Sequence, residues 1–412
     1  MELYLHIPFC VRKCLYCDFL SFPVDGETRQ KYVDKLAEEI RSCGKRLRSE
    51  ENRIVTSVFI GGGTPSLLTV EQIHTVMSSV RESFALAPDA EITIEANPGA
   101  FDEARVRSWK KEGINRLSLG LQSSKREELQ CLGRIHSFED FLDSFRLARE
   151  GGFDNINVDL MSALPGQTVE SFQETLKKVT ELNPEHISAY SLILEEGTPF
   201  YQWYGENAEE DTEKLKDAGE DEMEEGTCTG RMPRLPIPDE DTDRQMYHET
   251  KEYLEERGYN RYEISNYARP GWECRHNIGY WNGTDYLGFG IGAASLMNGE
   301  RFAVTTSLDA YLDYSAEELE QGLQYRNPEV LTENERMEEF MFLGLRLTEG
   351  VAAADFKERF GRELESVYWE PLSKLEEEGL LTMYGAEEER KFRLTEYGLD
   401  VSNYALAEFL LQ

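Results

Sequence analysis

Three cysteines near the N-terminus, Cys10, Cys14 and Cys17, are the residues whose type and spacing most clearly indicate chemistry. Cysteine thiolates are the usual ligands of iron-sulfur clusters, and a full protein cage takes four of them. No fourth cysteine follows in the segment HIPFCVRKCLYCDF. The spacing therefore predicts a 4Fe-4S cluster held at three corners, with one iron open to a small ligand and to chemistry.

A disulfide scaffold and a structural zinc site are the alternatives for this segment. The chain has 412 residues and seven cysteines without a pattern of pairs, unlike the small secreted domains that disulfides stabilise. Structural zinc takes four ligands, and His6 could complete such a set, but no second Cys/His pair with knuckle spacing follows. The cluster is the favoured interpretation, and it fits a reducing compartment.

Charge and hydropathy limit the partners of the chain. Its formal net charge is -35, with 79 Asp and Glu against 44 Lys and Arg, so its average surface repels phosphate backbones. The N-terminus lacks the basic region and long apolar run of a signal peptide. No stretch approaches the roughly 20 apolar residues of a membrane span. We expect a soluble, cytoplasmic protein without a nucleic-acid partner, and peripheral membrane contact stays open.

Six short apolar or β-branched runs alternate with amphipathic segments in the first half of the chain. They cover residues 3–7, 55–61, 91–97, 116–122, 156–161 and 186–193. Thr69 and Ser137 stand where helix N-caps belong. Strands separated by helices run parallel, and right-handed crossovers wind them into a barrel or an open sheet. The expected fold class is α/β, a partial (β/α)6 barrel of the TIM type, two units short of closure.

Residues suited to chemistry collect directly after these predicted strands. The cysteines follow the first, Gly61 to Thr64 follow the second, and Glu95, Gln122, Asp159 and Ile193 end the next four. Taken singly, each could cap a helix, complete a turn or lie on the surface. The carboxyl ends of barrel strands form one rim, however, so these residues are expected to converge on a ligand site.

Four regions are predicted, with boundaries at 1–204 for the barrel, 205–243 for an acidic insertion or linker, 244–331 for a barrel extension and 332–412 for a C-terminal domain. Eleven acidic residues between Glu206 and Glu225 accompany only Lys214 and Lys216, which indicates a solvated loop. The extension combines a helix ended by Gly258 with the aromatic-rich, irregular segment YNRYEISNYARPGWECRHNIGYWNG.

The C-terminal region reads as helices, a β-hairpin and a final helix, an α+β arrangement that resembles a winged helix. It carries 19 acidic and 9 basic residues from Thr332 to Gln412, a net charge of -10. A DNA-groove binder would need the opposite sign. A packing or lid role is therefore expected.

The cysteine spacing, with Tyr16 before the last cysteine, resembles the radical S-adenosylmethionine superfamily, and IGGGTPS after the second strand strengthens the likeness. Glycines let backbone N–H groups approach a ligand closely. The resemblance implies that adenosylmethionine chelates the open iron, that the glycine motif contacts its amino group, and that the reduced cluster cleaves the sulfonium to a deoxyadenosyl radical.

Within that superfamily the chain is similar to the group of coproporphyrinogen dehydrogenases and HemW-like heme chaperones. The motifs YLHIPFC, GGGTPS, EANP, GLQS, LGRIH, VDLMSALPGQT, YEISNYARPG and HNIGYW occur in the expected order. The similarity implies an adenosylmethionine pocket lined by Tyr4, Tyr16, Gly62, Gly63, Thr64, Glu95, Gln122, Arg134, Asp159 and Ile193. Carboxylates suit ribose hydroxyls, a guanidinium suits a carboxylate and a tyrosine ring can lie against adenine.

Three features separate the chaperones from the decarboxylating oxidases of this group. Phe19 stands where the oxidases place a further cysteine, only nine residues precede Cys10, and HNIGYW matches the HNxxYW motif associated with heme binding. Heme is therefore expected near His276, with Tyr280 and Trp281 as flat apolar surface. A structural, hydrogen-bonded role for His276 and ligation by the Cys274 thiolate remain alternatives.

The sequence thus predicts a heme chaperone that binds heme and transfers it to an acceptor protein, and that carries a 4Fe-4S cluster completed by adenosylmethionine. The cluster could regulate oligomeric state or transfer. An oxygen-independent coproporphyrinogen III oxidase is the first alternative, and a radical RNA-modifying enzyme is the second. Enzymatic activity stays open, and no catalytic residue is assigned.

Overall fold

The computed structural model describes residues 1–47, 54–205, 235–386 and 389–411, so most of the predicted acidic insertion lies outside the described residues. Six parallel strands alternate with helices in the first half, which confirms the predicted order. The strands are β1 (Glu2–Ile7), β2 (Ile54–Gly62), β3 (Ala85–Ala96), β4 (Arg116–Gln122), β5 (Ile156–Ser162) and β6 (His186–Ser191). Only β3 differs clearly from its predicted range, because it starts at Ala85 rather than at residue 91.

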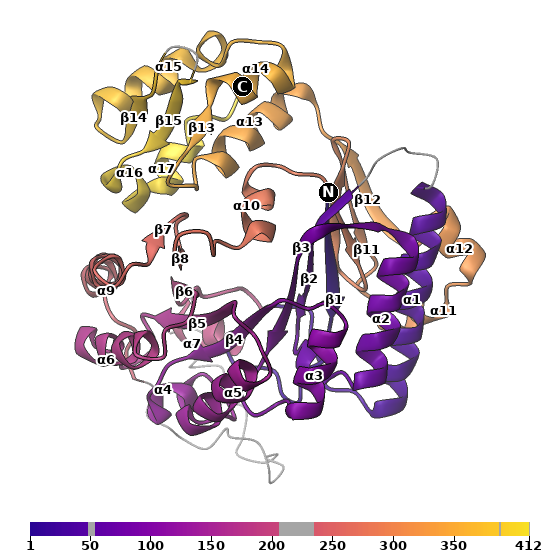
Figure 1. Cartoon of the computed structure of the whole chain (residues 1–412). Coiled ribbons are helices and arrows are strands. Elements are labelled where there is room, and N and C mark those ends of the chain that lie inside the picture. The colour runs from indigo at the N-terminus through magenta and orange to yellow at the C-terminus, as the bar shows by residue number, and fades with distance from the viewer. Residues whose placement is uncertain (48–53, 206–234, 387–388, 412) are drawn as a thin grey trace, which may run out of the picture.

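Amphipathic helices follow these strands and bury one face against the sheet, as α1 and α2 show on the outside of the barrel (Figure 1). The helices are α1 (Gly26–Leu47), α2 (Val70–Ser83), α3 (Glu103–Lys111), α4 (Arg126–Cys131), α5 (Phe138–Glu150), α6 (Val169–Thr180) and α7 (Pro199–Tyr204). Thr69 and Ser137 cap α2 and α5 through their side-chain oxygens, as predicted.

The sheet continues beyond both ends of the six-stranded row. Its order is β12-β11-β10-β9-β1-β2-β3-β4-β5-β6-β8-β7, and β9 pairs parallel with β1 while the other added strands pair antiparallel. The added strands are β7 (Asn260–Arg261), β8 (Asn266–Ala268), β9 (Tyr286–Phe289), β10 (Ala294–Met297), β11 (Glu300–Val304) and β12 (Tyr325–Val330). Within the described residues, β7 and β12 are the two end strands of this row and do not pair with each other, so the barrel is open, as expected.

The segment that was expected to be irregular contains a helix, α10 (Arg275–Trp281), which holds the HNIGYW motif. Its first N–H groups need a partner that local sequence does not supply. The buried Glu91 carboxylate of β3 accepts from the backbone N–H groups of Arg275 and His276, at 3.1 and 3.2 Å. A contact between residues far apart in sequence therefore fixes this helix, and the expectation of an irregular segment was wrong.

Two further differences concern helix limits. Helix α9 (Glu240–Glu255) starts inside the range 205–243 that was assigned to the insertion. The single final helix that was expected is divided into α16 (Glu396–Asp400) and α17 (Ser402–Ala407) by a non-helical Val401. These limits depend on single backbone conformations, which the spacing of apolar residues does not encode.

The C-terminal region forms its own apolar core, separate from that of the barrel. It comprises α13 (Glu333–Gly344), β13 (Val351–Ala352), α14 (Ala353–Phe360), α15 (Leu364–Glu377), β14 (Leu381–Tyr384), β15 (Lys391–Leu394), α16 and α17. Strands β14 and β15 pair antiparallel, which confirms the predicted hairpin. Pro371 lies inside α15, and the helix is broken nearby at Tyr368.

This region lies beside the N-terminus, at the ends of the strands where the chain enters the barrel (Figure 1), whereas the cysteines follow the other end of β1. Helix α10 lies between β2 and α13. Glu396 of α16 pairs with Arg261 and Lys251, at 2.6 and 3.0 Å. The C-terminal region therefore packs against the barrel floor and does not cover the cysteine rim. Across the described ranges, no helix is long and apolar enough to cross a bilayer.

Candidate functional site

A cavity of about 500 Å³ extends through the barrel from the carboxyl ends of the strands. The three cysteines line it together with eight other residues of the predicted site. These are Tyr16, Gly62, Gly63, Glu95, Gln122, Arg134, Asp159 and Ile193. Side chains from six strands thus meet at one rim, as parallel topology requires. Their roles toward a ligand remain predictions.

Three predicted residues lie outside this cavity lining. Thr64 lines an adjacent groove of about 300 Å³ on the outer side of the rim, and its hydroxyl donates to Cys10 Sγ at 3.5 Å. Tyr4 is largely buried in the barrel, where its hydroxyl lies 3.0 Å from His6 Nδ1 and its ring stacks on Phe59. His276 lies at the other end of the barrel.

The cysteine loop is held in place by backbone contacts to two neighbouring segments. The Cys10 N–H donates to the Phe22 carbonyl at 3.2 Å, and the Leu15 N–H donates to the Leu132 carbonyl at 3.1 Å. All three cysteines are free and partly exposed. Burial raises the pKa of the Cys17 thiol. The loop therefore presents three accessible thiols without regular secondary structure.

This donor set fits a cluster better than a single zinc ion. Among the described residues, no three His, Cys, Asp or Glu side chains converge closely enough to hold one metal ion. A zinc site needs four ligands around one point, whereas an iron-sulfur cube bridges thiolates that stand apart. The three thiols that line one cavity are the residues that could hold such a cluster.

The glycine loop after β2 is packed directly against the cysteine loop. Gly62 has a φ of +111°, and a Cβ there would lie 2.5 Å from the His6 ring. A Cβ on Gly63 would lie 2.8 Å from the backbone of Phe9. Only glycine fits these positions, because β1 and β2 run side by side up to Ile7 and Gly62. The two loops therefore form one continuous wall of the cavity.

Arg134 spans the cavity wall, so its interpretation as a surface charge is wrong. Its Nη1 donates to Asn97 Oδ1 at 2.8 Å, while its buried Nε has no partner among the described residues. Burial raises the pKa of the adjacent Tyr16 phenol to about 12, although the guanidinium opposes this shift. Gly120 makes room for the arginine, since a Cβ there would lie 3.1 Å from Nη2.

Glu95 and Asp159 are half-buried in the cavity lining and do not cap the helices that follow them. Glu95 accepts from the Gly62 N–H at 2.9 Å, and burial together with Asp159 raises its pKa to about 8. Asp159 accepts from Asn157 Nδ2 at 2.7 Å and from Ser118 Oγ at 3.2 Å, and burial raises its pKa. Both carboxyls can thus bind hydroxyl groups of a ligand.

His276 is buried, with 7% of its surface exposed, and its ring is fixed against β1 and β2. Nδ1 lies 2.8 Å from Ser57 Oγ and 3.7 Å from Glu2 Oε2, and the ring stacks on Phe59. Burial and, secondly, Arg116 lower the pKa of His276 to about 4. The structure therefore favours a hydrogen-bonded, structural role for this histidine.

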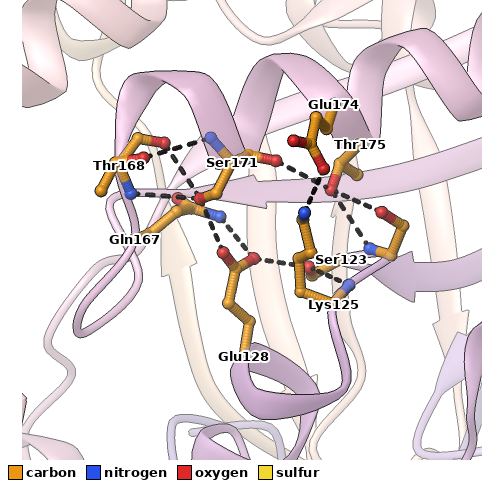
Figure 2. Close-up of polar contacts among 9 residues, drawn as sticks. Ser123, Lys125, Glu128, Gln167, Thr168, Ser171, Glu174 and Thr175 are labelled. Carbon is orange, nitrogen blue, oxygen red and sulfur yellow. Dashed lines mark hydrogen bonds and ion pairs between the residues drawn. The ribbon is translucent and has the colours of Figure 1, made fainter.

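The loops of the rim are tied together by the buried carboxylate of Glu128 in α4 (Figure 2). It accepts from Ser123 Oγ at 2.5 Å, from Gln167 Nε2 at 2.9 Å and from Ser171 Oγ at 2.8 Å. Ser123 directly follows Gln122, and α4 leads to Arg134. Glu128 therefore positions two predicted ligand contacts without touching the cavity itself.

Sequence reasoning missed several cavity residues, among them Arg116, Ser118 and Gly120 on β4. They are every second residue of one strand and so face the same side, and Gln122, which follows a register shift after Gly120 and has a φ of +69°, lines the same cavity. That alternation was a usable signal once Gln122 had been placed inside. Asn277 of α10 was also missed, although it lines the far end of the same cavity.

Comparisons with known proteins agree with this geometry. A family model described as the radical SAM superfamily matches residues 4–179, and the HemN C-terminal domain model matches residues 331–401. Heme chaperone HemW of Bacillus subtilis is 34% identical over 99% of this chain and 98% of its own. Heme chaperone HemW of Escherichia coli is 37% identical over 71% of this chain and 69% of its own.

The solved structure of coproporphyrinogen III oxidase (HemN) from Escherichia coli, described as a radical SAM enzyme, superimposes with a TM-score of 0.77. It is 26% identical, and the match covers 99% of this chain and 89% of the oxidase.

Gly120→Ala should displace the Arg134 guanidinium and weaken binding of adenosylmethionine, the predicted ligand, about tenfold, the loss expected for one charge-assisted hydrogen bond. Gly26→Ala is the matched control, because a Cβ there meets nothing within 4 Å. Calorimetric titration of both variants after anaerobic cluster reconstitution checks this expectation. Equal affinity in the two variants would contradict the role given to Arg134.

Glu128→Gln should lower the free energy of unfolding by about 1–3 kcal/mol, because the new side-chain NH2 group would face Ser123, Gln167 and Ser171, which donate to the carboxylate in the wild-type protein. Adenosylmethionine affinity should fall as well, since Gln122 and Arg134 lose their support. Glu127→Gln, on the exposed side of the same helix, is the control. Urea unfolding and ligand titration provide the readouts, and an unfolding curve identical to that of the control would refute the positioning role.

Proposed function

Because this chain belongs to the HemW heme chaperone family of the radical SAM superfamily, we propose that it binds heme and passes it to an acceptor protein. We further propose that its barrel cavity holds a 4Fe-4S cluster and adenosylmethionine. The observation that carries this proposal is the convergence of three cysteines and eight other predicted residues on one cavity. A cytoplasmic location suits a cluster that needs a reducing environment.

Cys10, Cys14 and Cys17 would hold the cluster, whose open iron and single electron supply redox chemistry when it is bound. Around it, Gly62 and Gly63 bring the backbone to the ligand without a side chain in the way. Arg134 offers a free Nε–H to a carboxylate, and Glu95 and Asp159 offer oxygens to hydroxyl groups. These residues bind and orient a small polar ligand and keep it beside the thiols.

The chaperone is favoured over the decarboxylating oxidase by Phe19 at the cavity mouth. This phenylalanine stands where the oxidases of the group place a further cysteine, and 55% of its surface is exposed. An exposed aromatic ring at a rim is typical of a contact surface rather than of a ligand to iron. An RNA-modifying enzyme is disfavoured, because the C-terminal region has a net charge of -10.

Heme would rest against the aromatic end of α10. Tyr280 is 39% exposed, and Trp281 lines a cavity of about 590 Å³ with Phe340 and Val351 of the C-terminal region. The exposed parts of these two rings would contact the porphyrin, while Arg346 covers one face of Trp281 and Asp355, Glu358 and Arg359 line the same cavity. His276 would then hold α10 in place through Ser57, rather than reach the iron from its buried position. An acceptor protein could take heme directly from this exposed end of α10. A second copy of the chain could contact the same surface, with the cluster determining whether it does.

Hemin titration of the reconstituted protein should give a saturable Soret shift. We expect His276→Ala and Ser57→Ala to weaken that shift alike, by about tenfold in affinity, because each removes one partner of a buried hydrogen bond that fixes α10. Thr56→Ala, whose side chain contacts only the carbonyl of Met1, is the control. A loss confined to His276→Ala would show that the imidazole itself ligates iron.

The same reconstituted sample, incubated with coproporphyrinogen III, adenosylmethionine and a reductant, separates chaperone from oxidase. The chaperone proposal expects no sustained decarboxylation and saturable hemin binding. Steady formation of decarboxylated porphyrinogen, or an unchanged hemin spectrum in the wild-type protein, would overturn it.

A further inference from the structure

Arg116 is a buried arginine at the floor of the barrel cavity. It starts β4, is 2% exposed and lines the cavity. Within the described residues, no carboxylate lies within an ion-pair distance of its guanidinium, and its buried Nε has no hydrogen-bond partner. A buried charge that lacks a paired group costs several kcal/mol. Such a residue is usually retained because it binds something.

The polar groups around Arg116 are already engaged with one another. Glu91 accepts from the N–H groups of α10, and Asp159 accepts from Asn157 and Ser118. His186 lies between Asn157 and the Tyr262 hydroxyl, at 2.6 and 2.8 Å. These bonds hold the acidic and aromatic groups of the floor in position and leave the donors of Arg116 free.

The charged and titratable groups that act on Arg116 are Cys274, Glu91, Tyr262 and Asp159. Burial lowers the pKa of the guanidinium, but these groups outweigh burial, so it stays charged. Cys274 is itself a neutral thiol, because burial raises its pKa to about 12. The floor thus has one fixed positive charge, and no neighbouring group that acts on it forms an ion pair with it.

Two further buried groups at this floor lack partners. Thr93 Oγ1 and Asn266 Oδ1 have no hydrogen bond among the described residues. Thr93 is the cross-strand neighbour of Arg116 in β3, and Asn266 of β8 lines the cavity. The Arg116 guanidinium and the Thr93 hydroxyl are donors that a carboxylate takes, whereas the Asn266 amide already bonds the Glu263 carboxylate and leaves only its Oδ1 acceptor without a partner.

We propose that Arg116, with Thr93, forms a carboxylate-binding subsite at the floor of the barrel cavity. It is separate from the cysteine rim, because β4 carries the chain about 20 Å from Arg116 to Gln122. The cavity volume of about 500 Å³ leaves room for an acidic arm beside one small cofactor, but not for a second large molecule.

The carboxylate source that fits this subsite is the propionate arm of a tetrapyrrole, a choice that rests on the proposed function. Asn277 supports it, because this residue of α10 lines the cavity floor while the same helix carries Tyr280 and Trp281.

Thermal unfolding of the ligand-free protein tests the subsite without any ligand. Arg116→Met should raise the melting temperature by roughly 2–4 °C, because it removes a buried charge that has no close partner. Arg261→Met is the matched control, since that buried arginine pairs with Glu396 at 2.6 Å and its loss should lower the melting temperature. A clear drop for Arg116→Met would make Arg116 a structural counter-charge and overturn the proposal.

Ligand titration then identifies the source. Arg116→Lys keeps the charge but not the bidentate geometry, so it is expected to fold and to bind its carboxylate about tenfold more weakly. Hemin is compared with its dimethyl ester, and adenosylmethionine with its decarboxylated form. A loss for hemin but not for the ester assigns a propionate. Adenosylmethionine, whose carboxylate is proposed to lie at the rim, should bind Arg116→Lys as it binds the wild-type protein, and a loss confined to adenosylmethionine would contradict the proposal.

Unchanged affinity for all four probes in Arg116→Lys would refute the subsite. If the wild-type protein bound no hemin, the proposed function would fail, whereas the melting temperatures would still decide on Arg116.

Discussion

The parallel pairing of β1 with β2 is the constraint on which the site depends. It brings His6 beside Gly61 and Ile7 beside Gly62, so the loops that leave the two strands start at the same height. The close approach of Gly62 to His6 and of Gly63 to Phe9 then joins the cysteine loop to the glycine loop. Because no side chain fits between them, three thiols and the glycine backbone, whose N–H groups bond Glu95 and the Ile7 carbonyl, face one cavity. The remaining strands add polar groups to a geometry that this pair has already set.

The interior of the barrel has two functional ends. The rim holds the cysteines, Arg134 and the carboxyls of Glu95 and Asp159, and Glu128 ties its loops together. The floor holds Arg116 and touches α10, which Glu91 anchors and which carries the aromatic residues proposed for heme. One cavity reaches both ends, so a ligand at the rim and a ligand at α10 share a wall. This arrangement offers a physical route by which cofactor occupancy could influence heme binding.

Local patterns were enough to predict the parts of the fold that local interactions determine. Strand and helix order, the caps at Thr69 and Ser137, and the collection of chemistry-bearing residues at strand ends all follow from spacing and residue type. Helix α10 could not be predicted in this way, because its cap is supplied by Glu91, far away in sequence. Arg116 was missed for a related reason: in RLSLGLQ it reads as the polar edge of a strand, and only the barrel-like arrangement of the strands around it buries it.

The central claim is that three cysteines hold a cluster with one iron open to adenosylmethionine. Its most direct test is visible absorbance and electron paramagnetic resonance of the protein after anaerobic reconstitution, before and after adenosylmethionine is added. The account predicts a cluster spectrum that changes on addition in the wild-type protein and in Cys131→Ser, whose thiol lies outside the cavity lining. It predicts loss of that spectrum in Cys14→Ser. A full cluster spectrum in Cys14→Ser, or a wild-type spectrum indifferent to adenosylmethionine, would contradict it.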